Sequence, residues 1–271
     1  TPKPSSAASD VYKRQGGRHA VFSPGKVDFI FMLDLTRIQG ISLDLDDTLW
    51  PVWPAIGRAE VVLHDWLRRH APRTAQAYDS PQALRELRLA VERDRPDLHH
   101  DLSGLRRESI RLALTQSGDD PALAEAAFEV FFAERQNVEL FDDVHEVLGT
   151  LAAHLPLVAL SNGNANVHRT GIGQYFRGAI HAREFGVGKP DRRIFEAAAQ
   201  AIDLPVAQVL HIGDDAVLDV QGGNDAGMQT VWINRAGKAW GLPTPPSLEV
   251  TSLAAVVEAL QPILRGAQPQ G

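Results

Sequence analysis

Short apolar runs recur along the chain, and their pattern predicts strands that are buried on both faces. The clearest runs are Ile41–Leu45, Leu157–Leu160, Val209–Ile212 and Thr230–Ile233, and weaker ones lie at Ala179–His181 and Leu248–Val250. They are rich in Ile, Val and Leu, and apolar and polar positions do not alternate cleanly within them. Near-continuous apolarity over so short a length is typical of a parallel sheet with helices on both faces.

Helical periodicity fills the intervals between several of these runs. Asp142–Leu155 carries apolar side chains at the i, i+3, i+4 and i+7 spacing of one helix face. Pro190–Ile202 also places apolar residues on one face, and its proline is expected at the first helical position. Ser252 is expected to cap a further helix, Leu253–Leu260. The alternation predicts an α/β fold with a doubly wound, Rossmann-like parallel sheet.

One interval, between the first two strand runs, is far longer than a single crossover connection needs. It contains helical patterns and no convincing strand, and Ser80-Pro81 and Asp120-Pro121 are typical helix starts. We therefore expect residues 54–136 to form an all-helical subdomain. It would be inserted into an α/β core made of residues 32–53 and 137–265.

Composition narrows the class of protein. The 271 residues carry a formal net charge of −7, which gives no general attraction for nucleic acid or an anionic membrane. No apolar run approaches the ~20 residues of a membrane span. There is no cysteine, which excludes disulfides, zinc–thiolate sites and thiol catalysis and fits a cytoplasmic protein. Residues 1–31 are rich in Ser, Pro, Gly and Lys, so we expect a disordered or non-native extension.

Polar residues follow the ends of the predicted strands, where open α/β sheets bind their ligands. Asp44 and Asp46 come at the end of the first run and are expected to face the same way, because strand side chains alternate. The other strand ends carry Ser161, Asn162, Asp214, Asp215 and, one helical turn on, Asp219. Each group alone could be only a turn or a helix cap.

Lys189 is harder to explain as a simple surface residue. It directly precedes Pro190 at a predicted helix start, where the helix dipole disfavours a cation. A lysine is understandable there if an anion lies between it and the helix end. The pattern therefore indicates an anion-binding site near Lys189.

In combination, the segments DLDDT, SNG, the Lys-Pro of GVGKPD, and GDDAVLD resemble the four motifs of the haloacid dehalogenase-like hydrolase superfamily. The resemblance covers residues 40–234, and the helical insert resembles the first type of cap domain in that superfamily. Its members are mostly magnesium-dependent phosphatases that act through a phospho-aspartate. The resemblance thus implies a phosphoric monoester hydrolase whose substrate is a small phosphorylated metabolite.

Carried onto this sequence, the motifs suggest a role for each polar residue. Asp44 would be the nucleophile and Asp46 the general acid and base. Ser161, Asn162 and Lys189 would bind the phosphoryl group.

The carboxylates would also hold Mg²⁺, a hard cation that prefers oxygen ligands. Asp44 and Asp214 would bind it directly, together with the backbone carbonyl of Asp46. Asp219 would hold a metal-bound water or orient Lys189. Asp47 is expected to brace the turn after the first strand, and Asp215 at most to assist the metal site.

The substrate prediction rests on the cap segment LRLAVERDRPDLHHDLSGLRRESIRLAL, residues 87–114, which is similar to bacterial flavin-pathway phosphatases. Those enzymes dephosphorylate 5-amino-6-(5-phospho-D-ribitylamino)uracil, a riboflavin precursor, and FMN. His100, Asp101 and Arg106 could contact the ribityl chain or the pyrimidine edge. Alternatively, Asp101 caps a helix and Arg106 is solvated.

Other functions stay open at this point. The first alternative is a generic sugar or nucleotide phosphatase of the same superfamily, and a phosphomutase shares all four motifs. A haloacid dehalogenase is disfavoured because its relatives typically lack an aspartate at the position of Asp46. A non-catalytic scaffold is disfavoured because every motif position is filled. The sequence does not distinguish a monomer from a homodimer.

Overall fold

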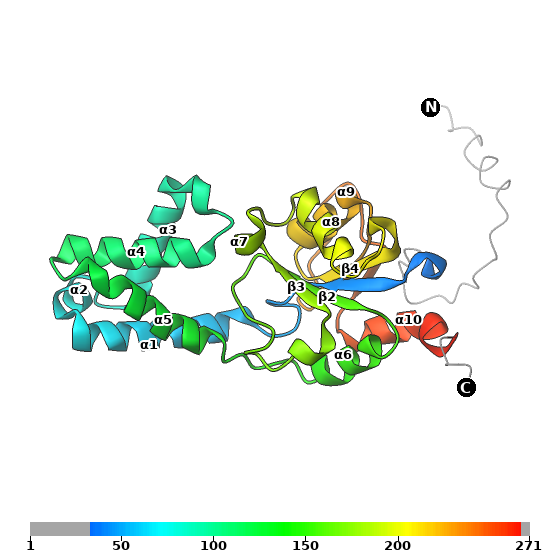
Figure 1. Ribbon diagram of the computed structural model, residues 1–271, viewed down its shortest axis with the longest axis horizontal. Helices are drawn as coiled ribbons and strands as arrows, with labels where there is room; N and C mark the ends of the chain where they lie inside the picture. Colours follow the sequence, from blue (N-terminus) through cyan, green and yellow to red (C-terminus); the bar gives the residue numbers. More distant parts are fainter. Residues whose placement is uncertain (1–32, 267–271) are drawn as a thin grey trace, which may run out of the picture. The chain divides into compact units, whose positions relative to one another are not determined.

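The computed structural model describes residues 33–266, so the expectation for residues 1–31 lies outside the described residues. Its centre is a parallel sheet of six strands in the order β3-β2-β1-β4-β5-β6, which confirms the predicted fold class (Figure 1). The strands are β1 (Gly40–Leu43), β2 (Leu157–Ser161), β3 (Gly178–His181), β4 (Val209–Gly213), β5 (Gln229–Ile233) and β6 (Leu248–Val250). Every residue of β1, β2 and β4 is buried, as the continuous apolar runs predict.

Side chains that alternate along the strands separate the core into two layers. Leu157 and Ala159 of β2 pack with α6 (Val144–Ala152) and α10 (Ala254–Gly266), whereas Val158 and Leu160 pack with α8 (Arg192–Gln200) and the end of α9 (Gly222–Ala226). Figure 1 shows these two pairs of helices on opposite faces of the sheet. The sheet is therefore doubly wound, and its buried faces leave the strand ends as the place for a site.

Five α-helices lie between β1 and α6: α1 (Val52–His70), α2 (Pro72–Ala77), α3 (Pro81–Asp94), α4 (Leu102–Ser117) and α5 (Ala124–Arg135). They share an apolar cluster of their own that contains no sheet residue, with Leu63, Leu67, Ile110, Phe128 and Phe131 among its members. We call α1–α5 the cap helices. Their role as a separate domain, with boundaries at residues 54 and 136, stays a prediction.

The remaining helical segments are short. They are α7 (Ala182–Phe185), a π-helical turn (Ala216–Gln221) and 3₁₀ turns at Leu35–Arg37, Pro96–Leu98, Pro121–Leu123, Gly173–Tyr175 and Val206–Gln208. None of the helices within residues 33–266 combines the length and the apolar character that crossing a membrane requires.

Several helix boundaries differ from the sequence prediction, and α6 spans Val144–Ala152 rather than Asp142–Leu155. Asp191 caps α8 by accepting a hydrogen bond from the Arg193 amide at 2.9 Å, so the helix begins after Pro190 rather than with it. The last helix, α10, extends past the predicted end at Leu260 to Gly266. Leu264 lies one turn beyond Leu260 and is also buried, which continues the apolar face.

Candidate active site

The carboxyl ends of β1, β2 and β4 lie level with one another, because Leu43 of β1 is paired with both Ala159 and Ile212. Asp44 follows β1 directly and Asp214 follows β4, while Ser161 is the last residue of β2. The sheet therefore brings together three motifs that are far apart in the sequence.

Lys189 reaches this edge from the loop between α7 and α8. Its ammonium nitrogen is 2.5 Å from Asp44 Oδ1 and 2.5 Å from Asp219 Oδ1. Burial alone would lower the pKa of Lys189, but the carboxylates of Asp219 and Asp44 outweigh it and hold that pKa above its ordinary value. The lysine is thus a buried cation. The anions beside it are side chains from distant segments rather than a group at the α8 terminus.

The acidic side chains around Lys189 form a group able to bind a metal ion. One oxygen each of Asp44, Asp214 and Asp219 lies within 4.8 Å of the others. Burial raises the pKa of Asp44 well above its usual range and, with the charges of Asp219, Asp47 and Asp215, raises the pKa of Asp214 to about 7. One lysine cannot neutralise three ionised carboxylates, so the group has an excess of negative charge that a bound cation would reduce. This oxygen donor set fits Mg²⁺.

Asp219 is held from two sides. Its Oδ1 accepts from Lys189 and lies 3.2 Å from Nε2 of His211, a fully buried residue of β4. Burial tends to raise the pKa of Asp219, but Lys189 and His211 outweigh burial and hold that pKa below its ordinary value. His211 Nδ1 in turn lies 2.5 Å from the hydroxyl of Ser42. His211 carries no motif signal in the sequence, because it lies inside the apolar run Val209–Ile212.

The nucleophile candidate is oriented by the turn that follows it. Thr48 donates a hydrogen bond from its hydroxyl to Asp44 Oδ2 at 3.0 Å. Asp47 adopts a positive φ of 60° and accepts from the Val52 amide at the start of α1. Asp47 thus braces the turn. Asp215 caps the π-helical turn by accepting from the amides of Val217 and Leu218.

Asp46 faces a different set of partners from Asp44. Arg135 Nη2, at the end of α5, donates to both Asp46 oxygens at 2.6 and 2.7 Å, and the Trp50 indole donates at 2.8 Å. Alternation along a strand does not apply to Asp44 and Asp46, contrary to the sequence prediction, because β1 ends at Leu43 and both aspartates lie beyond it. Only the backbone carbonyl of Asp46 stays a candidate metal ligand, since its carboxylate is not part of the acidic group.

The loop after β2 positions the lysine. Asn162 accepts from the Lys189 amide at 2.7 Å and donates to the Lys189 carbonyl at 2.9 Å, so both ends of its side-chain amide are engaged. Ser161 Oγ accepts from the Gly163 amide at 2.9 Å. A Cβ at Gly163 would overlap Asp46 Oδ2, which explains why a glycine stands there. The role of Asn162 in binding substrate stays a prediction, and in the structure its side chain contacts the Lys189 backbone.

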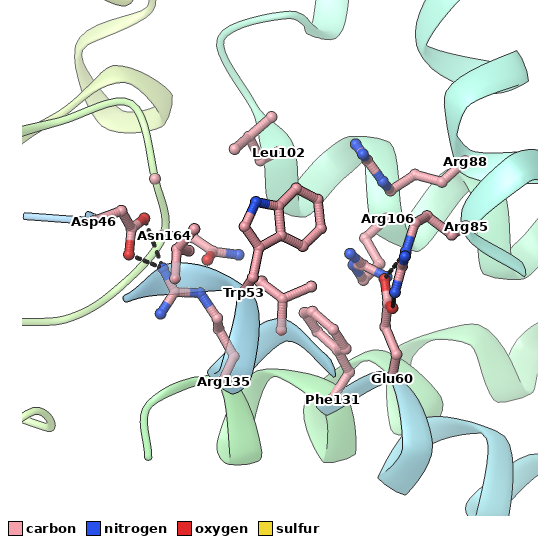
Figure 2. A pocket seen from close by; sticks show the side chains of 13 residues that line it. Asp46, Trp53, Glu60, Arg85, Arg88, Leu102, Arg106, Phe131, Arg135 and Asn164 are labelled. Atoms are coloured by element: carbon pink, nitrogen blue, oxygen red, sulfur yellow. Dashed lines mark hydrogen bonds and ion pairs between the residues drawn. The ribbon is translucent and has the colours of Figure 1, made fainter. Parts of the chain in front are cut away.

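A cavity of about 180 Å³ opens beside Asp46 toward the cap helices (Figure 2). Its lining residues are Asp46, Val52, Trp53, Ile56, Glu60, Arg85, Arg88, Leu102, Arg106, Phe131, Arg135, Gly163 and Asn164. The walls are therefore apolar and aromatic, with charged groups near Asp46 and at the far end. Trp53 is 61% exposed, and the Arg85 guanidinium lies 5.5 Å from the centre of its ring.

The three cap residues predicted to bind substrate do not share one location. Arg106 lines the cavity, stacks on Phe131 at 3.8 Å and lies 3.6 Å from the buried Glu60, which also pairs with Arg85. It is buried rather than solvated. Burial lowers the pKa of Arg106 to about 10, which still leaves it cationic at neutral pH.

His100 and Asp101 are absent from the lining of the cavity. Asp101 caps α4 by accepting from the Gly104 amide at 2.8 Å, and it lies 3.4 Å from Arg183 of α7. These contacts agree with the alternative interpretation, in which Asp101 caps a helix. The sequence motifs missed Trp53, Glu60 and Arg135, which carry no local pattern beyond ordinary helix periodicity.

Comparison with known proteins gives one family and two kinds of named relative. The model of the haloacid dehalogenase-like hydrolase family matches residues 38–227. The chain is 33% identical over 240 residues to the 5-amino-6-(5-phospho-D-ribitylamino)uracil phosphatase YigB of Escherichia coli, with 85% of this chain and 99% of that protein covered. It is 27% identical to a (S)-2-haloacid dehalogenase of Pseudomonas sp. strain YL, over 83% of this chain and 95% of that one.

Among solved structures, a 2-haloacid dehalogenase from Pseudomonas syringae pv. Tomato DC3000 superimposes with a TM-score of 0.76 at 36% identity. The match covers 83% of this chain and 99% of the other. The similarity therefore extends through both the sheet and the cap helices. The names of the relatives alone do not show whether the bond that is broken is a phosphate ester bond or a carbon–halogen bond.

Proposed function

Because this chain belongs to the haloacid dehalogenase-like hydrolase family, as its four motifs predict, we propose that it is a magnesium-dependent phosphomonoesterase acting through a phospho-aspartate. The observation that carries the proposal is the arrangement around Asp44. This carboxylate is held by Lys189 and Thr48 beside two further carboxylates, and Asp46 lies next to a cavity that can take a leaving group.

The proposed reaction has two steps. In the first, an oxygen of Asp44 attacks phosphorus and the ester P–O bond breaks, while Asp46 gives a proton to the departing oxygen. In the second, Asp46 takes a proton from a water molecule, which attacks the phosphorus of the acyl phosphate. Phosphate leaves and the Asp44 carboxylate is restored. Lys189 and Ser161 bind the phosphoryl oxygens and stabilise their negative charge.

Asp44, Asp214 and the backbone carbonyl of Asp46 would hold Mg²⁺, with Asp219 linked to it through water or through Lys189. When bound, the ion neutralises charge on the phosphoryl oxygens and on the carboxylates that surround them. Asn162 serves this chemistry indirectly, because it fixes the backbone of Lys189.

The dehalogenase activity named for two of the relatives is the second candidate. Asp46 favours the phosphatase, because displacement of a halide from carbon needs no general acid at this position. The deciding assay measures hydrolysis of p-nitrophenyl phosphate with Mg²⁺ and chloride release from 2-chloropropionate in EDTA. We expect turnover in the first only. Chloride release with no phosphate hydrolysis would reverse the assignment.

For the substrate, we propose 5-amino-6-(5-phospho-D-ribitylamino)uracil and FMN, with a broader sugar or nucleotide phosphatase as the alternative. Support comes from the YigB relative, which matches over nearly its whole length, and from Arg106, a buried cation whose guanidinium can donate to ring carbonyls. Comparing kcat/KM for both flavin compounds with ribose 5-phosphate and UMP tests it. Equal values across the panel would leave only the general phosphatase.

A further inference from the structure

Arg135 is a buried cation whose donors are only partly used. It is the last residue of α5, and its side chain is 1% exposed. Nη2 donates to both oxygens of Asp46, but Nε and Nη1 are buried and have no hydrogen-bond partner within residues 33–266. Buried polar groups in folded proteins nearly always have a partner. Two unpaired donors on one charged side chain therefore point to a ligand.

The cavity indicates which part of a substrate that ligand is. Its lining includes Asp46 and Arg135 but not the phosphoryl-binding candidates Ser161 and Lys189 or the nucleophile candidate Asp44. Arg135 thus borders a space beside Asp46 that the phosphoryl-binding candidates do not line. Figure 2 shows it beside Asp46, with the apolar cavity wall formed by Trp53 and Phe131 beyond. A group reaching Arg135 from this space belongs to the departing alcohol.

A guanidinium has five N–H donors and no acceptor, so its partner must be an acceptor such as a hydroxyl oxygen. We propose that Arg135 binds a hydroxyl oxygen of the leaving alcohol close to the ester bond, and that the enzyme thereby selects phosphates of polyhydroxylated alcohols over those of plain alkyl chains. This inference rests on the proposed phosphatase function and specifies the leaving group of the same site. An alkyl chain offers no acceptor and would leave Nε and Nη1 unpaired.

A purely structural role would be a tether between the cap helices and the sheet through Asp46. That role uses Nη2 alone and leaves the other two donors unexplained. A second arginine, Arg58 of α1, pairs with Glu134 and Glu139 near the end of α5 without lining the cavity. Arg58→Ala is therefore a matched control for loss of a cap arginine.

The test compares ribitol 5-phosphate with n-pentyl phosphate, which share the chain length and differ in the hydroxyl groups. kcat/KM is measured for both esters with wild type, Arg135→Ala, Arg135→Lys and Arg58→Ala. The ratio of the two values is used, because the fraction of active enzyme cancels when both are measured on one preparation. A variant that folds poorly is thus still informative.

We expect wild type to prefer ribitol 5-phosphate, and Arg135→Ala to lower that preference by about tenfold or more, as for loss of a hydrogen bond to a charged group. Arg135→Lys should retain part of the preference and Arg58→Ala all of it. If Arg135→Ala slows both esters equally and changes their ratio by less than about threefold, Arg135 acts only through Asp46 and the proposal is wrong.

Failure of the role proposed for Arg135 can be distinguished from failure of the proposed phosphatase function. Wild-type hydrolysis of p-nitrophenyl phosphate tests the phosphatase activity, because that ester carries no hydroxyl next to the ester bond. Turnover of p-nitrophenyl phosphate with an unchanged ratio in Arg135→Ala rejects the role of Arg135 alone. No turnover of any phosphate ester by wild type rejects the proposed function and, with it, this inference.

Discussion

Asp44 has surroundings unlike those of an ordinary surface aspartate. It is buried, its two oxygens are directed by Lys189 and Thr48, and its pKa is raised chiefly by burial. A carboxylate held in one orientation at the end of a strand suits a nucleophile, because little conformational entropy is lost when it is oriented for attack.

Replacement of Asp44 by asparagine should abolish turnover while preserving the fold. Asparagine is nearly isosteric, and its one carbonyl oxygen can still accept a hydrogen bond from Lys189 or from Thr48, which donate to different oxygens of Asp44. It cannot form the acyl phosphate. Steady-state hydrolysis of p-nitrophenyl phosphate and a thermal melt measure the two effects. Residual activity above a few per cent of wild type would contradict the covalent mechanism.

Arg106→Ala should raise KM for FMN by about tenfold while changing KM for p-nitrophenyl phosphate little. The reason is that Arg106 lies at the part of the cavity lined by Glu60 and Arg85, which a small aryl group does not need to occupy. Initial rates over a range of each ester provide the measurement. An equal increase for both esters would mean that the substitution disturbs the cap helices as a whole.

Asp214 should make the metal-free protein lose stability as the pH rises. Its folded-state pKa is about 7, above the value of ~4 in an unfolded chain. The folded state therefore binds this proton more tightly, and the resulting stability is present below pH ~4 and lost as the pH rises through about 7. In EDTA, the fall in Tm between pH 5 and pH 8 should be smaller for Asp214→Asn than for wild type. The same substitution at the exposed Asp225 is the control, and an equal fall in all three proteins would refute the effect.

At the scale of elements, four cap helices supply most of the cavity. Trp53 and Glu60 come from α1, Arg85 from α3, Arg106 from α4, and Arg135 from α5. The helices keep these positions through their shared apolar cluster, so the polar groups are held by packing some distance away. The start of α4 is a sensitive point, because Arg106 follows its cap by little more than one turn.

Asp101→Ala should lower the free energy of unfolding by about 1 kcal/mol through loss of the α4 cap, whereas Asp101→Ser should lower it much less. The serine hydroxyl can still accept from the Gly104 amide. Denaturant titration of the two variants measures the difference. KM for FMN in Asp101→Ser distinguishes the two interpretations of this residue, since an increase would restore it as a substrate-binding group.

At the scale of the whole molecule, the sheet concentrates negative charge at one edge. Asp44, Asp214 and Asp219 come from two strand ends and a following turn, and Lys189 from a separate loop. Folding therefore assembles repulsion that does not exist in the extended chain, and a bound cation would relieve it.

Mg²⁺ should raise Tm, and EDTA should reverse the increase. A ligand that binds only the folded state stabilises it by about 2.7 kcal/mol at 100 times its Kd. Asp214→Ala should lose most of this shift, with Asp219→Ala losing less. Thermal melts over a Mg²⁺ titration give the result without an activity assay. A Tm that is independent of Mg²⁺ in wild type would argue against the metal site.

The sequence by itself determined the fold class, the strands and the four motifs. These properties are local: a run of apolar residues predicts a buried strand wherever it lies, and each motif is a few adjacent residues. Strand order then follows from a small set of allowed topologies, which bring motifs at strand ends to one edge. The sequence alone therefore predicts that the segments around Asp44, Ser161, Lys189 and Asp214 lie together.

Only the tertiary structure decided the partners of these residues. Arg135 meets Asp46 across 89 positions and Lys189 meets Asp44 across 145, and no periodicity encodes such pairs. The motif predicts that Asn162 binds the substrate, and only the structure shows that its side-chain amide also contacts the Lys189 backbone. The cavity depends in the same way on how four helices pack. Helix faces can be predicted from spacing, but which charged groups on those faces meet is set by packing against elements remote in the chain.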